Sequence, residues 1–168
     1  MGCGKSSVGR RIASTTGRRF ADTDEAVAAR AGRSISQIFA ERGEAHFRDL
    51  ETAALEEFSS AKGLVLATGG GIVLREENRA ALRRIGPVVW LDADPDILFE
   101  RVSRNRKRPL LHTDDPRKTF DELLAARRLI YEDAADFHVD STGLSHDDVA
   151  RIVVGKASDL TDRNPDPV

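Results

Sequence analysis

The chain has 168 residues, the size of a single domain that can bury a substantial core. Its 26 Lys and Arg residues nearly balance its 28 Asp and Glu residues, and the formal net charge of −2 argues against nucleic acid and against a membrane surface as partners. A single cysteine excludes a disulfide framework and a multi-cysteine zinc site, and it favours the reducing conditions of the cytoplasm, where we expect the protein to work.

Helical segments and short apolar segments alternate along the chain. Glycine, proline and capping residues bound the predicted helices, which cover residues 8–15, 24–30, 35–42, 44–60, 76–85, 95–104, 116–134 and 147–157. The predicted strands cover residues 19–22, 63–67, 88–91 and 137–140. The second and third strands are continuous apolar runs, which predicts burial on both faces. The alternation indicates an α/β fold with a parallel sheet between helices, in which ligands bind at the carboxyl ends of the strands.

A glycine-rich segment opens the first helix. Gly2-Cys3-Gly4-Lys5-Ser6 matches the second half of the phosphate-binding pattern G-x-x-x-x-G-K-[ST]. Its backbone N–H groups and the helix N-terminus attract phosphate oxygens, the lysine adds a positive charge, and the serine hydroxyl suits Mg²⁺. The alternative is a plain glycine-rich turn that caps a helix. The pattern's first glycine and the strand that feeds it would precede Met1, so we expect this chain to be less stable than one with about ten more upstream residues.

Two carboxylates, Asp22 and Asp24, lie at the end of the first predicted strand. On an extended segment, side chains two residues apart point the same way. Beside a triphosphate, one carboxylate can hold a Mg²⁺-bound water and the other can orient an acceptor hydroxyl. The alternative is that an aspartate here caps the following helix.

Three further motifs follow in order: GEAHFRDLE at residues 43–51, GGG at residues 69–71 and RPLL at residues 108–111. Three glycines after a buried strand indicate close approach of the backbone to a ligand. Together with the phosphate loop and the DTD segment at residues 22–24, this ordered set resembles the shikimate kinase family. The resemblance runs from Met1 to about Val154.

The resemblance implies a three-layer P-loop kinase fold like that of nucleoside monophosphate kinases. Its parallel sheet has the strand order 2-3-1-4-5, and the central first strand is missing from this chain. The domain is expected to cover residues 1–158, with a lid at about residues 104–116 and substrate-binding helices at about residues 24–60. Residues 159–168 are expected to form a disordered tail.

The resemblance also implies an activity, the transfer of the γ-phosphoryl group of ATP to the 3-hydroxyl of shikimate. This step lies on the route to chorismate and the aromatic amino acids. The implied cofactor is Mg²⁺, the implied partners are ATP and shikimate, and the expected state is a monomer. Nucleic acid and membranes are not expected as partners.

Each motif residue takes the role that the family gives to its position. The implied ATP contacts come from Gly2, Cys3, Gly4, Lys5, Ser6, Ser7, Arg101 and Arg108. The implied Mg²⁺ ligands are Ser6 and Asp22. The implied shikimate contacts are Asp24, Arg48, Gly70 and Arg127, and Glu51 orients the first of the two arginines. The implied catalytic residues are Lys5, Asp24 as the base, and Arg108 on the lid.

Two alternatives remain beside this interpretation. One is another small-molecule kinase, such as a gluconate kinase, which shares the phosphate loop. The other is a shortened, weakly active or inactive nucleotide-binding form. One departure from the family is local: Ser145 and His146 stand where the family has an Asn-Pro pair over the adenine.

Overall fold

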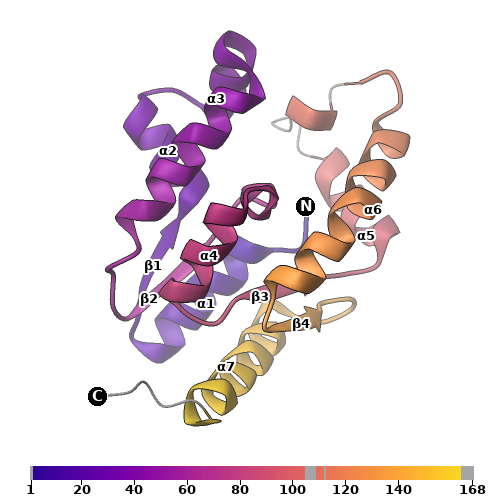
Figure 1. The fold of residues 1–168 in the computed structure, drawn as a ribbon. Coiled ribbons are helices and arrows are strands. Elements are labelled where there is room, and N and C mark those ends of the chain that lie inside the picture. The colour runs from indigo at the N-terminus through magenta and orange to yellow at the C-terminus, as the bar shows by residue number, and fades with distance from the viewer. Residues whose placement is uncertain (1, 105–108, 112, 164–168) are drawn as a thin grey trace.

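The computed structural model describes residues 2–104, 109–111 and 113–163. Its α-helices are α1 (Lys5–Thr16), α2 (Thr23–Ala31), α3 (Ile35–Glu57), α4 (Glu76–Ile85), α5 (Pro95–Ser103), α6 (Pro116–Ala134) and α7 (His146–Arg163). Its strands are β1 (Arg19–Asp22), β2 (Leu64–Ala67), β3 (Val89–Asp92) and β4 (Phe137–Asp140), and two short 3₁₀ helices are η1 (Ile72–Leu74) and η2 (Pro109–Leu111). The α/β class with parallel strands is therefore confirmed (Figure 1).

The four strands pair two and two. Strand β1 pairs with β2, with Arg19 opposite Leu64, and β3 pairs with β4, with Val89 opposite Phe137; both pairs are parallel. Helices cover the strands from both sides. Helices α1 and α7 pack together on β3 and β4 around Val8, and α4 and α6 pack with η1 on the other side. No pairing joins β2 to β3 among the described residues.

An apolar cavity of about 500 Å³ separates the two strand pairs. Val65 of β2, Trp90 of β3, Ile12 of α1 and Val153 of α7 are among the residues that line it. The prediction that β2 and β3 are buried on both faces is therefore wrong. All of β3 and the first three residues of β2 are only half-buried, because each strand leaves one edge open to this cavity.

Local signals set most helix ends. Ser34 and Gln37 form the predicted capping box at the start of α3. The predicted break at Gly43 appears as a kink inside α3, with φ 78° and ψ 176°. At the other end of the chain, α7 continues to Arg163, so residues 159–163 of the expected tail are helical. The reason is that the first helix-breaking proline comes only at Pro165.

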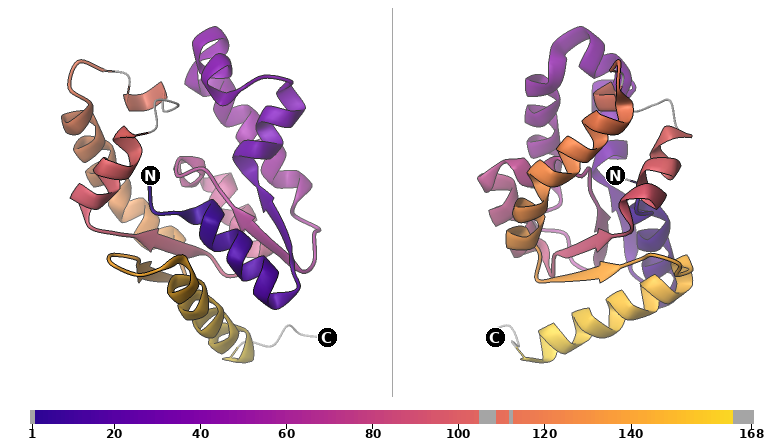
Figure 2. Two further views of the ribbon diagram at one scale, coloured as in Figure 1. Left: turned by 180° about the vertical axis from the view of Figure 1, so that it is seen from behind. Right: turned by 90° about the vertical axis from the view of Figure 1, so that its right-hand side faces the viewer.

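Two helical arms stand on either side of the glycine-rich segment that leads into α1. In Figures 1 and 2, the segment that leads into α1 lies between an arm made of α2 and α3 and an arm made of α5 and α6. Of the expected lid, residues 105–108 and 112 lie outside the described residues, while Leu111 of η2 is buried with Leu98 and Phe120. Within the described part of the chain, none of the helices combines the length and apolar composition that a membrane crossing requires.

Candidate active site

The glycine-rich loop is shaped by close backbone packing. Gly2 and Gly4 have φ values of 78° and 79°, the left-handed region that favours glycine. A Cβ on Gly2 would lie 2.8 Å from the carbonyl oxygen of Leu98, and one on Gly4 would lie 3.0 Å from Nε2 of His146. Cys3 is buried in the α5–α6 cluster. No side chain caps α1, so its first N–H groups are left to bind an anion.

Two of the residues expected to bind ATP, Lys5 and Arg101, contact other residues of this loop through their side chains. The Lys5 ammonium reaches back over the loop to 3.8 Å from Sγ of Cys3, and Arg101 donates to the carbonyl oxygen of Gly2 at 3.4 Å. Ser7 is exposed on α1. Arg108 lies outside the described residues.

Asp22 connects the phosphate loop to α2. Its Oδ2 accepts a hydrogen bond from Oγ of Ser6 at 2.6 Å, and its Oδ1 accepts one from the backbone N–H of Asp24 at 2.9 Å. Asp22 is thus the N-cap of α2, and Asp24 stands in the first helical turn. Of the two alternatives for this segment, the structure shows the helix cap, because an aspartate before a helix satisfies free N–H groups there. Asp24 lies in the helix, as the predicted helix over residues 24–30 implies.

The Ser6–Asp22 pair offers two oxygen donors to a magnesium ion. A hydroxyl and one carboxylate are the hard oxygen donors that Mg²⁺ takes when phosphates and waters complete its shell. No group of three or more His, Cys, Asp or Glu among the described residues forms a cation cage. The donor set therefore fits a metal held mainly by nucleotide and water, and it does not resemble a dedicated protein cage.

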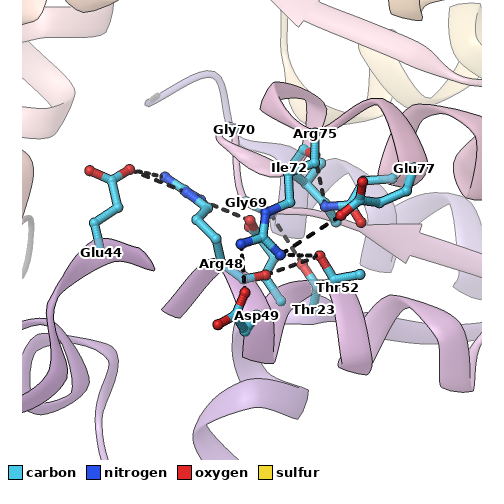
Figure 3. A network of polar contacts seen from close by, with 12 residues as sticks. Thr23, Glu44, Arg48, Asp49, Thr52, Gly69, Gly70, Ile72, Arg75 and Glu77 are labelled. Carbon is cyan, nitrogen blue, oxygen red and sulfur yellow. Dashed lines mark hydrogen bonds and ion pairs between the residues drawn. The ribbon is translucent and has the colours of Figure 1, made fainter. Parts of the chain in front are cut away.

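Arg48 is a buried guanidinium with two carboxylate partners. Its Nη1 donates to Oε2 of Glu51 at 2.8 Å. Its Nη2 and Nε donate to Oε1 of Glu44 at 2.8 and 3.2 Å, and Figure 3 shows Glu44 beside the guanidinium. Burial by itself would lower the pKa of Arg48, but the charges and hydrogen bonds of Glu51 and Glu44 outweigh it and raise that pKa. A Cβ on Gly71 would lie 2.3 Å from the guanidinium nitrogens, so a side chain at this position would push the guanidinium out of its place.

Glu51 is fully buried and only half satisfied. Its Oε1 has no hydrogen-bond partner among the described residues. A Cβ on Gly69 would lie 2.7 Å from this oxygen and 2.8 Å from Oδ1 of Asp24, so the two carboxylates converge on the triple glycine. Burial raises the pKa of Glu51 above its ordinary value, although the positive charge of Arg48 acts to lower it.

The triple glycine is held from two sides. The N–H of Gly69 donates to Oγ1 of Thr23 at 3.2 Å, and the hydroxyl of Tyr131 donates to the carbonyl oxygen of Gly70 at 2.6 Å. One turn before this tyrosine on α6 lies Arg127, which is 7% exposed. Within the described part of the chain no hydrogen bond or ion pair engages its guanidinium. A buried cation in this state is a binding point for an anion.

The structure thus brings Asp24, Arg48 and Glu51 together at the triple glycine. Glu44, Thr23 and Tyr131 also contact this region, and the sequence interpretation gave none of them such a contact. Spacing offered a signal for two of them: Glu44 precedes Arg48 by four residues, and Tyr131 follows Arg127 by four, which places each pair on one helix face.

Comparisons with known proteins agree on one family. The family model for "Shikimate kinase" matches residues 1–157. The shikimate kinase of Symbiobacterium thermophilum is 43% identical over 165 residues, which are 97% of this chain and 95% of that protein. That of Bordetella avium is 47% identical over 141 residues, which are 84% of this chain and 68% of that protein.

Solved structures give the same result. The shikimate kinase of Acinetobacter baumannii in complex with shikimate superposes with a TM-score of 0.91 at 35% identity, covering 95% of this chain and 89% of that one. The shikimate kinase of Aquifex aeolicus superposes with a TM-score of 0.80 at 33% identity, covering 96% and 94%. The chain belongs to the shikimate kinase family.

Proposed function

We propose that this chain transfers the γ-phosphoryl group of ATP to the 3-hydroxyl of shikimate, as its family relatives' names imply. The observation that carries the proposal is the buried Arg127, whose guanidinium has no hydrogen-bond or ion-pair partner among the described residues. It lies on α6 one turn from the tyrosine that holds Gly70, and its charge attracts Glu51, the ion-pair partner of Arg48. Two guanidiniums beside a carboxylate base suit a small acid that also carries hydroxyls.

The nucleotide would bind on the N-terminus of α1. The N–H groups of the loop and of Ser7 would receive the phosphates, and Lys5 would lie against the terminal ones. Ser6 and Asp22 would hold Mg²⁺, with the carboxylate acting mostly through water, and the metal would neutralise charge on the phosphates. Arg101, which touches the loop through Gly2, would flank the adenine.

Asp24 would receive the hydroxyl proton during transfer. As the 3-oxygen of shikimate bonds to the γ-phosphorus, the bond from that phosphorus to the bridging oxygen breaks, and its electron pair leaves with ADP. Lys5 and Arg108 would stabilise the charge on the moving phosphoryl oxygens. Gly70 would contact the substrate, and a lid at about residues 104–116 would exclude water.

We further propose that the complete sheet has the family's strand order 2-3-1-4-5. In that order, strand 1 is an additional strand between β2 and β3, and β1, β2, β3 and β4 are strands 2, 3, 4 and 5. The support is geometric, because both open edges face the same apolar cavity of about 500 Å³. We expect the domain of residues 1–158 to act as a monomer in the cytoplasm.

The test is ADP release by the purified chain with ATP, Mg²⁺ and either shikimate or gluconate. We expect release that depends on shikimate, does not occur with gluconate and is lost in Asp24→Asn. A version extended upstream by a strand and a Gly-x pair is assayed in parallel, because it separates a weak form from a wrong substrate. Absence of shikimate-dependent release in both versions would refute the proposed function.

A further inference from the structure

The further inference concerns the two carboxylates that hold Arg48, and it rests on the proposed function. They differ in how far they are buried and in which nitrogen atoms of the guanidinium they contact. The Glu51 side chain has no exposed surface, whereas 45% of the Glu44 side chain is exposed. Glu51 uses one oxygen on Nη1, and Glu44 uses one oxygen on the Nε–Nη2 edge. That edge is where a carboxylate pairs with a guanidinium through two parallel hydrogen bonds.

The Arg48 guanidinium itself is fixed. The backbone at Gly71 lies so close that a Cβ there would meet the guanidinium carbon at 2.4 Å, and Phe47 supports it with its ring centroid 5.1 Å away. The ion pair with Glu51 holds the third side. Arg48 is thus contacted on these three sides, and its Nε–Nη2 edge, which Glu44 occupies, is the side left for an incoming carboxylate.

Glu44 stands where the backbone can change direction. It directly follows Gly43, whose φ of 78° and ψ of 176° interrupt α3 and which has open space around its Cα. Glu44 also begins the second half of α3, so no preceding helical turn holds it. In Figure 3 it reaches Arg48 from the side opposite Gly69 and Gly70. Glu44 is half-exposed and follows the kink at Gly43, so of the two carboxylates it is the one that can leave Arg48.

We propose that Glu44 is an internal stand-in for the substrate carboxylate. In the empty site it occupies the Nε–Nη2 edge of Arg48, and it is displaced when the carboxylate of shikimate binds there and to Arg127. Glu44 thereby sets the affinity for the acid. It satisfies the Nε–Nη2 edge that Glu51 leaves unbonded, and it makes weak anions poor competitors because each must first displace a tethered carboxylate.

The experiment measures the dissociation constant of shikimate by calorimetry in Glu44→Gln, Glu44→Asp and the unchanged protein. Both variants are expected to bind shikimate about threefold or more tightly, because a neutral amide and a shortened carboxylate each compete less well for the arginine edge. Glu44→Asp keeps the charge, so it separates displacement from a general field effect. Glu41→Gln is the matched control, since this glutamate lies on the same helix but pairs with Arg33. It is expected to leave the constant unchanged.

Methyl shikimate, which lacks the carboxylate, gives the second readout. Its affinity is expected to be equal in all four proteins. Unchanged or weaker binding of shikimate in both Glu44 variants would overturn the inference, as would an equal gain in Glu41→Gln. Absence of shikimate binding in every protein, including the strand-extended version, would instead refute the proposed function. Glu44 is half-exposed, so a thermal melt of each variant suffices to show that it folds.

Discussion

Arg127 and Arg48 are both buried, but replacing them should shift the thermal midpoint in opposite directions. Arg127 is 7% exposed and has no bonded partner in the described structure, so the fold carries the desolvation cost of its charge. Arg127→Met keeps the packed volume and removes that charge. Because Glu51 offsets part of the cost through a weak attraction, we expect a gain of about 1 kcal/mol, which raises Tm by about 2–4 °C in a chain of this size.

Arg48→Met removes a partner that a fully buried carboxylate depends on. It leaves Glu51 without its ion pair at zero exposure. Breaking such a pair from one side costs about 3 kcal/mol or more, and Tm should fall by about 6–12 °C. Both substitutions should weaken shikimate binding by about 100-fold, because charge-assisted hydrogen bonds to the acid are lost.

Thermal melts by circular dichroism, with and without shikimate, measure both effects. The unchanged protein should gain Tm with added shikimate, and neither variant should. If Arg127→Met lowers Tm as Arg48→Met does, then Arg127 has a stabilising partner and the argument for an open anion site is wrong.

Three further outcomes are expected. Tyr131→Phe removes the 2.6 Å hydrogen bond to Gly70 and should lower stability by about 1 kcal/mol and kcat/KM for shikimate severalfold; unchanged kinetics would show that this bond does not position the loop. Adding an apolar strand and a Gly-x pair upstream should raise Tm and ATP affinity together, whereas equal values in both versions would show that the cavity between β2 and β3 needs no strand. Because burial raises the pKa of Glu51 above the ordinary 4.5, its folded form keeps a proton that the unfolded chain has lost. The free energy of unfolding should therefore fall as pH rises from 4.5 through that raised pKa. Urea titrations should show that the free energy of unfolding changes less with pH in Glu51→Gln than in the unchanged protein over this range. Parallel pH profiles of the two proteins would contradict the predicted direction.

Much of the fold could be predicted because its signals are local. The α6 helix begins at Pro116 and ends at Ala134 as its proline and periodicity indicate, and the capping box of α3 follows from two residues three apart. The kink at Gly43 likewise follows from one residue that tolerates a positive φ. In these cases the sequence within one or two turns contains the whole cause.

Other features depend on segments that are distant in the chain. The half-burial of β2 and β3 comes from the cavity between them, and no apolar run can report what stands beside it. The structure decided between the two alternatives for the DTD segment, because Asp22 bonds both Ser6 and the start of α2. This network joins two elements, and local preference alone left both geometries open.

The sequence by itself determined the family, the α/β class and the chemical types at the site, because motif order, spacing and helix boundaries are properties of the chain. Only the tertiary structure distinguished Arg48, held between Glu44 and Glu51, from Arg127, which no carboxylate holds in the described residues. The physical reason is that burial and pairing decide what a charge can do. Both are set by where α3, α6 and the triple glycine meet in space.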